Sequence, residues 1–533
     1  MSITAKLSEL KAQARKVWAL SLPYFHSDEK WKARGLLLAI VLLNLGTVFM
    51  LVQLNDWNRI FYDALQEKNQ PVFWQQLGRF TYLAFAYIII AVYKFYLTQL
   101  LELRWRTWMT EHYIQRWLAN KAFYTLELLR FSKQADMSPD NPDQRIQEDA
   151  QQFTALTVSL SMGLLNAVVT LLSFVGILWG LSGGFEFKFN GSTYEIAGFM
   201  VWMAVVYAVV GSAITHWIGK PLVALNFNQQ RYEADFRHHL VRVREYSEAI
   251  ALDKGEAVER GAINLRFGSV LQNYLELINA QKRLTWFTVG FGQAAVVFPF
   301  IVAAPRFFSG AIQLGQLMQI ASAFGRVQDA LSWFVDNYAS LATWKATTDR
   351  LTSFEASLCT VEAQHSALLR QYVPVVPEYR TQVATENVAN ADQLQTQELT
   401  LALPDGTQLV QGAVLHARTG DSIIVTGPSG SGKSTLFRAI AGIWPYASGQ
   451  LQLPAGFEQR AMFIAQRPYF PNAPLRVALA YPDEAADYTD AQLCAALDAA
   501  LLPQLKTRLD DEDAWGQKLS GGEQQRLAIA RVF

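Results

Sequence analysis

Six apolar segments dominate the first part of the chain and constrain its fold most strongly. They lie near residues 35–54, 78–99, 156–182, 196–218, 284–304 and 316–338. A helix rises 1.5 Å per residue, so each segment is long enough to cross a hydrocarbon core about 30 Å thick. The last segment also contains Arg326, Asp329 and Asp336, so part of its surface has to contact water or protein. The pattern predicts an all-α membrane domain with six spans over residues 35–370.

The placement of lysine and arginine predicts the orientation of these spans. The connections near 55–77, 183–195 and 305–315 hold few basic residues, whereas residues 100–155 and 219–283 are rich in them. Short loops that remain in the cytoplasm are enriched in positive charge. We therefore expect both termini to be cytoplasmic. A buried helical core of a soluble protein could imitate the apolar runs, but not readily this alternation of loop charge.

Residues 1–34 form a separate basic segment before the first span. Leu7, Leu10, Ala14 and Val17 fall on one face of a helix, with basic residues between them. This pattern suits an amphipathic helix lying on the cytoplasmic membrane surface. A solvated N-terminal helix is the alternative reading.

The overall charge and the cysteines exclude several classes of protein. The 46 basic and 46 acidic residues cancel, so no global positive field favours nucleic acid. Charged residues make up 17% of the chain against about 25% in ordinary soluble domains, which favours a membrane protein. Two cysteines, Cys359 and Cys494, cannot form a disulfide framework or a cysteine-rich metal site.

The character of the sequence changes after the last span. An amphipathic helical run is followed by a polar stretch, and we expect residues 371–397 to be a linker. From residue 398 to 533, short alternating runs, glycine-rich turns and helical patterns predict an α/β domain.

A glycine-rich motif carries the clearest chemistry in this α/β domain. It follows an apolar run at 422–426, expected to be a strand, and precedes a helical pattern. Its residues are Gly427, Pro428, Ser429, Gly430, Ser431, Gly432, Lys433, Ser434 and Thr435. Strand, glycine loop and helix form the setting of a phosphate-binding P-loop, whose amide groups point at phosphate oxygens. Lys433 would reach the terminal phosphates of ATP and Ser434 would bind Mg²⁺.

A second motif near residue 520 suggests the family. Leu519, Ser520, Gly521, Gly522 and Glu523 resemble the LSGGQ or LSGGE signature of ATP-binding cassette (ABC) proteins. The resemblance implies an anion site that caps the γ-phosphate of ATP held by the opposite subunit, and therefore a homodimer. Between the two motifs, Gln466 resembles the glutamine of the family's Q-loop. This implies a contact with Mg²⁺ and the attacking water, and a role in sensing the membrane domain.

Short motifs elsewhere narrow the resemblance. The chain looks like the SbmA/BacA-type permeases, the YddA-like proteins that add a nucleotide domain, and the peroxisomal subfamily D transporters. The motifs are Asn55–Trp57, Phe61–Leu65, Asn141–Ile146, Glu233–Arg237, Ala304–Phe308 and Gly442–Pro445. The YddA-like group matches best, because it is bacterial and carries both domains. The resemblance implies a half-transporter of exporter-type fold in the bacterial inner membrane, the lipid bilayer being its immediate partner.

Two features depart from the family pattern. The aromatic residue that stacks on adenine is expected near Leu403–Pro404, yet no aromatic residue occurs between Glu398 and Phe437. The family's Walker B strand and H-loop histidine follow the signature, whereas the sequence given ends at Phe533. The acidic run Asp510–Asp513 precedes the signature and is expected to be a solvated turn. We therefore expect the native protein to continue beyond Phe533, and the chain as given to bind nucleotide but hydrolyse it poorly.

Three ionisable residues at membrane depth are candidates for the translocation path. Lys94 lies in the second span, and Arg326 and Asp329 lie in the sixth. Arg326 and Asp329 are three residues apart, so they share a helix face and could pair. Two cytoplasmic stretches, near 137–150 and 245–262, are expected to form short helices that dock on the nucleotide domain.

The sequence thus predicts an ATP-driven transporter that moves a peptide-like or other hydrophilic solute across the bacterial inner membrane. One alternative is a proton-coupled SbmA/BacA-type peptide permease with a non-hydrolysing nucleotide domain. Another is a regulatory nucleotide-binding membrane protein that transports nothing. The identity of the solute stays open, because the resemblances point variously to peptides, cobalamin-like compounds and acyl-CoA esters. The direction of transport stays open too.

Overall fold

The computed structural model describes residues 3–131, 141–182, 185–189, 192–370, 383–388, 393–454 and 456–533. The chain divides into two compact units. The helical unit comprises Met1–Ala122 and Pro139–Thr360, and the α/β unit comprises Phe123–Ser138 and Val361–Phe533. A short piece of the chain between two long helices therefore belongs to the α/β unit.

The helical unit is built from long helices, and each of the six apolar segments lies almost wholly within one of them. The helices are α1 (Ile3–His26), α2 (Lys30–Gln66), α3 (Gln70–Leu118), α6 (Ala150–Ser182), α7 (Phe199–Glu245), α8 (Ser247–Leu252), α9 (Glu256–Phe308), α10 (Leu314–Asp336) and α11 (Tyr338–Arg370). Among the described helices, α2, α3, α6, α7 and α9 are long and apolar enough to cross a membrane. The sixth apolar segment forms α10, whose crossing of the membrane stays a prediction.

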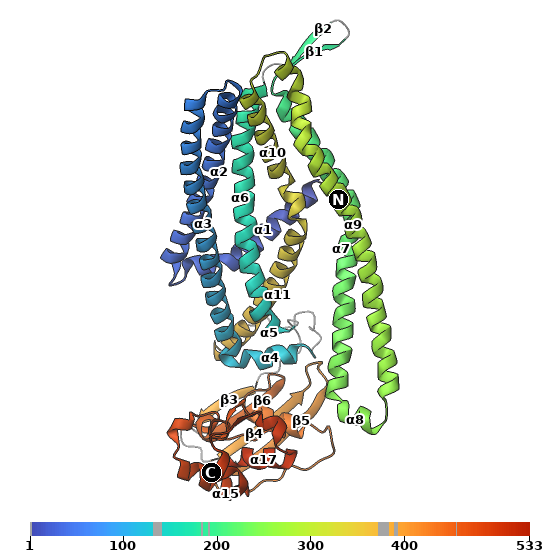
Figure 1. Ribbon diagram of the computed structural model, residues 1–533. Coiled ribbons are helices and arrows are strands. Elements are labelled where there is room, and N and C mark those ends of the chain that lie inside the picture. The colour runs from blue at the N-terminus through green and yellow to red at the C-terminus, as the bar shows by residue number, and fades with distance from the viewer. Residues whose placement is uncertain are drawn as a thin grey trace. The chain divides into compact units, whose positions relative to one another are not determined.

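Helix α10 packs into the bundle although it carries charged residues. Its buried side chains include Ile320, Phe324 and Val327, which recur at helical spacing and therefore form one face. This face joins a core cluster with residues of α6, α7 and α9, among them Phe174, Leu178, Met200, Val201, Ala204 and Ala303. Figure 1 shows α2, α3, α6 and α10 side by side, and α7 and α9 as a long hairpin joined by α8. The charged residues of α10 stay off the packed face.

Polar contacts between helices fix α10 against α2. The amide of Asn55 donates a hydrogen bond to the carbonyl oxygen of Gln319 at 3.2 Å. The backbone N–H of Gly315 donates to Oδ1 of Asp63 at 2.8 Å. A Cβ atom at Gly315 would lie 2.0 Å from the carbonyl oxygen of Arg59, so only glycine permits this approach. Asn55 and Asp63 belong to the short motifs on which the family resemblance rests.

Ion pairs attach α11 to three other helices of the helical unit. Asp349 pairs with Lys16 of α1 at 2.7 Å, and Glu355 pairs with Arg116 of α3 at 2.6 Å. The carboxylate of Asp149, whose side chain is 2% exposed, accepts two hydrogen bonds from Arg350, at 2.9 and 2.5 Å. Arg145 donates a further hydrogen bond to Asp149 at 2.5 Å. Helix α11 is therefore held near its middle by charge contacts.

Asp149 ends a π-helical turn, Arg145–Asp149, which follows the single turn α5 (Pro142–Gln144) and leads into α6. The extra residue of a π-turn rotates the side chains that precede it, and such turns are frequent at functional sites. Here both Arg145 and Asp149 are buried and form an ion pair with each other. The turn thus gives α6 a buried carboxylate aimed at α11.

The helical unit ends away from α8 in a small hairpin of strands β1 (Phe185–Phe189) and β2 (Ser192–Ile196), paired antiparallel. The α/β unit contains a four-stranded sheet in the order β3-β6-β4-β5. Its strands are β3 (Val383–Val388), β4 (Gln393–Ala402), β5 (Gln408–Arg418) and β6 (Ala447–Pro454). Strand β4 pairs antiparallel with β5 and β6, and β3 pairs parallel with β6.

The α/β unit also contains short helices. They include α12 (Lys433–Ile440), α14 (Leu475–Ala480), α15 (Asp490–Ala499), α16 (Trp515–Lys518) and α17 (Gly521–Ala530). A two-residue strand pair, β7 (Ala473–Pro474) with β8 (Glu512–Asp513), joins the start of α14 to the segment before the signature. Leu475, Leu497, Trp515 and Leu527 are fully buried in one cluster. This cluster gives the signature region its own hydrophobic core.

Two local predictions differ from the structure. Residues 383–388 and 393–397, expected as linker, form β3 and the start of β4, because their alternating side chains find ladder partners in β5 and β6. The run at 422–426, expected as a strand, has no ladder partner among the described residues, and Ile424 is 86% exposed. A strand requires a hydrogen-bonded neighbour, so residue pattern alone did not suffice.

Replacement of Asp149 tests the attachment of α11. Asp149→Asn leaves Arg145 and Arg350 without their carboxylate, and we expect a loss of about 3 kcal/mol of stability, near the lower limit for a buried pair because Arg350 is partly exposed. Asp349→Asn removes the exposed pair with Lys16, and we expect a loss below about 1 kcal/mol. The thermal unfolding midpoint of the protein in lipid nanodiscs measures both. Equal midpoints for the two variants would contradict a structural role for the buried pair.

Candidate functional site

The glycine loop joins the end of β5 to the start of α12 and leaves the first turn of that helix open. Gly432 is the N-cap of α12, with φ of 88°, and no side chain caps the helix. The first backbone N–H groups of a helix have no partner within it. Together with the positive end of the helix dipole, they form an anion site at this point.

Gly432 is held close to strand β5. A Cβ atom at this position would lie 3.0 Å from Cγ2 of Val410 and 3.3 Å from Cβ of Leu409. Its left-handed φ also disfavours any other residue. Two independent constraints therefore require glycine at the last position before Lys433.

Lys433 folds back over the loop. Its ammonium group donates hydrogen bonds to the carbonyl oxygens of Gly427 and Pro428, both at 2.7 Å. The loop is thereby closed around its cation at the beginning of α12. A phosphate bound at the helix N-terminus would meet this ammonium group beside the open amides.

The remaining predicted residues of this site differ in exposure. Ser434 is exposed on the first turn of α12, whereas Thr435 is buried in the helix. Gln466 is exposed in a bend. The hydroxyl of Ser434 and the amide oxygen of Gln466 are the type of oxygen donor that Mg²⁺ accepts next to phosphate and water. The exposed donors therefore fit the predicted metal, and Thr435 supports the helix from within.

The signature motif is also a helix N-terminus, but a capped one. Ser520 is the N-cap of α17 and forms a capping box with Glu523. The backbone N–H and the hydroxyl of Ser520 donate to Oε2 of Glu523 at 3.0 and 2.8 Å, and the N–H of Glu523 donates back to Oγ of Ser520 at 3.4 Å. These contacts, with the nearby charge of Arg526, hold the pKa of Glu523 below its ordinary value. The motif thus exposes Ser520, Gly521 and Gly522 on a fixed turn.

Several buried groups position the signature turn. Leu519 and Trp515 are buried, and the indole N–H of Trp515 donates to the carbonyl oxygen of Ala473 at 2.9 Å. The amide of Gln524 donates to the carbonyl oxygens of Gly516 and Leu519. Each contact lies within the signature region or connects it to the strand pair β7 and β8. The hydrogen bonds of the P-loop and of the signature are thus made in separate neighbourhoods of the α/β unit.

Arg531 connects the signature helix to the segment that follows Gln466, and sequence reasoning missed it. Its guanidinium donates to the carbonyl oxygens of Tyr469 and Ala478, at 3.0 and 2.7 Å, and lies 4.7 Å from the ring centre of Phe470. Burial lowers the pKa of Arg531. Its only signal in the sequence was a basic residue near the end of a helix, which is common on any surface.

A short helix outside the predicted docking stretches packs on the α/β sheet. Helix α4 (Ala122–Leu129) follows α3 in the chain, and Leu128 lies in a buried cluster with Leu399, Leu401, Trp444 and others. Tyr124 packs against the same cluster, and burial raises its pKa. Of the expected docking stretch near 137–150, residues 137–140 lie outside the described residues and the rest belongs to the helical unit, so its docking stays a prediction. Residues 142–150 form α5, the Arg145–Asp149 turn and the first residue of α6.

The aromatic side chains behind strand β4 serve the core. Trp444 is buried, and its indole N–H donates to the carbonyl oxygen of Ala402 at 2.9 Å. Its ring also lies 5.7 Å from the guanidinium of Arg438. These contacts use the Trp444 ring inside the protein, so it cannot substitute for the stacking aromatic residue that the sequence lacks near Leu403.

The three candidate path residues are not brought together. Arg326 and Asp329 are both exposed, and the ion pairs found among the described residues do not include one between them. Their pairing, and their role in the translocation path, stay predictions. Lys94 is half-buried on α3, with no ion pair among the described residues.

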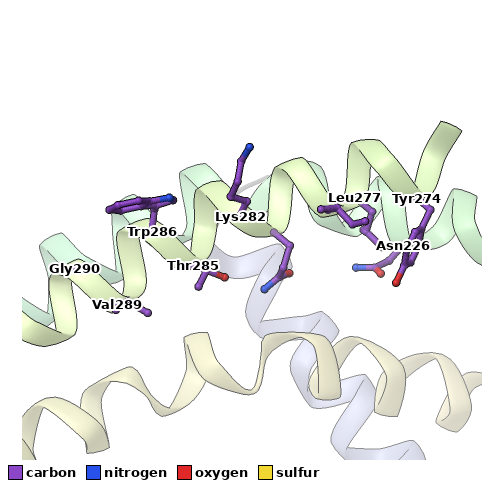
Figure 2. Close-up of a pocket in the computed structure, with 10 residues that line it drawn as sticks. Asn226, Tyr274, Leu277, Lys282, Thr285, Trp286, Val289 and Gly290 are labelled. Carbon is purple, nitrogen blue, oxygen red and sulfur yellow. The ribbon is translucent and has the colours of Figure 1, made fainter. Parts of the chain in front are cut away.

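A groove along α9 offers a different candidate for solute contact. It has a volume of about 720 Å³ and is lined by one residue of α7 and nine of α9. These are Asn226, Tyr274, Leu277, Ile278, Gln281, Lys282, Thr285, Trp286, Val289 and Gly290. Figure 2 shows Trp286 and Lys282 on one flank of α9, and Thr285 and Val289 on the other. Sequence reasoning missed this groove, because no charged pair or motif marks it.

Comparison with known proteins shows the family to which the chain belongs. Residues 20–308 match the family ABC transporter transmembrane region 2, and residues 410–533 match the family ABC transporter. The inner membrane ABC transporter ATP-binding protein YddA of Escherichia coli is 32% identical, covering 98% of this chain and 88% of YddA. ABC transporter D family member 2, a chloroplastic protein of Arabidopsis thaliana, is 33% identical, and the match spans 99% of this chain and 79% of that protein.

A solved structure shows the same fold. The structure of a bacterial Atm1-family ABC exporter with ATP bound matches with a TM-score of 0.61 at 16% identity, over 95% of this chain and 84% of that one. A helical membrane domain followed by an ATP-binding cassette domain defines a half-size transporter of exporter-type fold. The chain belongs to the ABC transporter family, with YddA-like and subfamily D homologues over nearly its full length.

The contact of Gly432 with β5 can be tested by pairing it with another loop glycine. Gly432→Ala and Gly430→Ala both place a side chain at a left-handed φ, at a backbone cost of about 1–2 kcal/mol. Only the Cβ at residue 432 meets Val410, since that at residue 430 meets open space. We expect weaker binding of a fluorescent ATP analogue in Gly432→Ala than in Gly430→Ala. The same affinity in both would show that the β5 contact is unimportant.

The cap of α17 should depend on pH. Because the pKa of Glu523 is lowered, its contact stabilises the helix above the ordinary pKa of a glutamate and is lost as the pH falls through the lowered value. Amide hydrogen exchange in the first turn of α17, corrected for intrinsic rates, should be slower than in Glu523→Ala at neutral pH. The two should converge in acid. Glu512→Ala, an exposed change in the same unit, should leave the exchange unaltered, and a difference that persists in acid would refute the assignment.

Proposed function

We propose that the protein is an ATP-driven transporter that works as a homodimer and moves a peptide-like or other hydrophilic solute across the bacterial inner membrane. The observation that carries this proposal is the pair of helix N-termini in one unit, the open one at Lys433 and the capped one at Ser520. Their separate hydrogen-bond neighbourhoods support an arrangement in which each ATP lies between the P-loop of one subunit and the signature of the other. The Atm1-type fold supports the same assembly.

Each residue of the site has a specific task in this proposal. The amides of the glycine loop and of the first turn of α12 bind the phosphates, and Lys433 neutralises their charge. Ser434 and Gln466 would hold Mg²⁺, which supplies charge neutralisation between the phosphates when it is bound. Across the dimer, Ser520, Gly521 and Gly522 present donors to the terminal phosphate of the partner's ATP.

Helix α4 supplies the mechanical connection. It lies between α3 and α6 in the chain, and Leu128 and Tyr124 pack within the α/β unit. Movement of the α/β units on binding ATP would therefore pull on the ends of two long helices. The ends of the chain would both be cytoplasmic. The ion-coupled alternative is not favoured, since both regions of the chain match ABC transporters.

The ATP-binding lysine gives the most direct test of this function. Lys433→Ala removes the cation next to the phosphates, and the ATPase rate of the purified full-length protein in lipid should fall at least about a hundredfold, as expected from a loss of about 3 kcal/mol of transition-state stabilisation. Lys506→Ala removes a surface lysine of the same unit that pairs with Asp498, and should not alter the rate.

Two results would refute the proposal. One is an ATPase rate in Lys433→Ala equal to that of the unaltered protein. The other is solute uptake into vesicles that proceeds without ATP and stops when a protonophore collapses the proton gradient.

A further inference from the structure

The groove on α9 reaches from the expected cytoplasmic side into the expected span. It extends from Tyr274 to Gly290, which is about 24 Å along a helix. The span was expected at 284–304, so Trp286 and Val289 lie at membrane depth, whereas Gln281 and Lys282 precede it. A solute entering from the cytoplasm would meet this surface at the boundary of the bilayer.

Polar side chains in the groove lack partners. Among the described residues, Asn226, Gln281 and Trp286 make no side-chain hydrogen bond. By contrast, Asn273, in the contact between α7 and α9, is buried and donates to the carbonyl oxygen of Leu225 and to Oε1 of Gln229, at 3.0 and 2.8 Å. The hairpin therefore satisfies the amides that hold it together and leaves those of the groove available. Amides at the border of an apolar phase require water or a polar ligand.

The charged residue that lines the groove favours a ligand of negative charge. Lys282 is its charged residue, and no carboxylate is among the residues that line it. Its ammonium group has a long contact, 3.3 Å, with the side chain of Asn279 on its own helix. The neighbouring Arg283 donates to a backbone carbonyl of that helix and does not line the groove. The groove is thus complementary to an anion.

Size and shape limit the ligand further. A volume of about 720 Å³ lies within the range of about 300–1,000 Å³ typical of sites for small organic molecules. Trp286 is 78% exposed and lies on the same flank of α9 as Lys282, while Leu277 and Ile278 add apolar surface towards the other end of the groove. Most of the exposed surface of the groove is apolar, and amide, hydroxyl and ammonium groups lie among the residues that line it.

We propose that this groove binds the transported solute, and that the solute is a small organic anion with a planar apolar part. The anionic group pairs with Lys282, the planar part stacks on Trp286, and Asn226 and Gln281 accept or donate hydrogen bonds to its polar atoms. This assignment rests on the proposed transport function and narrows its substrate class.

Binding of a fluorescent anion tests the groove without any need for ATP hydrolysis. The probe is dansylglycine, and its neutral counterpart is dansylglycinamide. Binding is measured by fluorescence enhancement with the full-length dimer in phosphatidylcholine nanodiscs, relative to empty nanodiscs. The unaltered protein should bind the carboxylate saturably and the amide about tenfold more weakly, as expected for loss of a charge-assisted hydrogen bond.

Matched variants locate the site. Lys282→Ala should weaken dansylglycine binding about tenfold, and Lys282→Arg should restore it to within about threefold. Trp286→Ala should weaken it about fivefold through loss of aromatic stacking. Two controls should change nothing, namely Arg283→Ala, the adjacent cation, and Trp217→Ala, a tryptophan of α7 that is 77% exposed outside the groove.

Four results would overturn the proposal. If Lys282→Ala and Arg283→Ala weaken dansylglycine binding equally, the binding depends on general surface charge and not on the groove. If dansylglycinamide binds as tightly as dansylglycine, the site does not select an anion. Competition by phosphatidylglycerol added to the nanodiscs would assign the groove to a lipid headgroup. The absence of saturable binding would mean that the second subunit covers it.

The ATP site and the groove can fail independently. Lys433→Ala should abolish ATP hydrolysis and leave dansylglycine binding intact. If that variant hydrolyses ATP normally, the transport mechanism is wrong whatever the groove binds. If it behaves as expected but the Lys282 variants bind the probe normally, only the assignment of the groove is wrong.

Discussion

The first turn of a helix has backbone N–H groups without partners inside the helix, and both nucleotide motifs of this chain lie at such a turn. In α12 the turn is left open, because a glycine stands where a capping side chain would be. In α17 the same shortage is met by the capping box of Ser520 and Glu523. The open turn provides amides for phosphate, and the capped turn provides a rigid edge that presents Ser520 and two glycines. In the proposed dimer, a phosphate would meet the open amides of α12 on one side and the capped turn of α17 on the other.

A small number of polar contacts determine how the apolar helices of the helical unit pack. Within a bilayer, packing between helices gains little from excluding water, so hydrogen bonds and close approach gain in relative importance. Asn55, Asp63 and Gly315 hold α10 against α2 in this way, and Asp149 holds α11 through Arg350. Helix α11 leads towards the α/β unit, and α4 is part of that unit. The apolar contacts of α4 and the charge contacts of α11 therefore lie near points at which the chain passes between the two units.

Sequence reasoning predicted the elements with strong periodic or local signals. The six apolar segments, the glycine loop before α12 and the signature at the start of α17 all depend on residues close together in the chain. It missed features that arise from distant residues. Leu128 docks because Leu399 and Trp444 form a surface for it, and Arg531 has a role because Tyr469 and Ala478 direct their carbonyl oxygens at it. The groove was missed for the same reason. The sequence does not show which amides have hydrogen-bond partners, as Asn273 does, and which have none.

The errors have equally specific causes. Residues 383–388 and 393–397 read as linker because they are polar, yet a strand needs only a hydrogen-bonded neighbour, which β6 provides for β3, and β5 and β6 provide for β4. Arg326 and Asp329 share a helix face by spacing, but the packed face of α10 is set by Ile320, Phe324 and Val327, which leaves both charged residues exposed. Spacing shows which residues can meet, and packing decides whether they do.

The central claim is that ATP joins the P-loop of one subunit to the signature of the other. Disulfide cross-linking between two differently tagged subunits tests it most directly, with Ser429→Cys in one, Gln525→Cys in the other, and Cys359 and Cys494 replaced by serine. Both positions are exposed, so neither change disturbs a buried contact. We expect a cross-link between subunits that forms with ATP and Mg²⁺ and is lost in Lys433→Ala. A cross-link yield that is independent of ATP, or none at all, would contradict it.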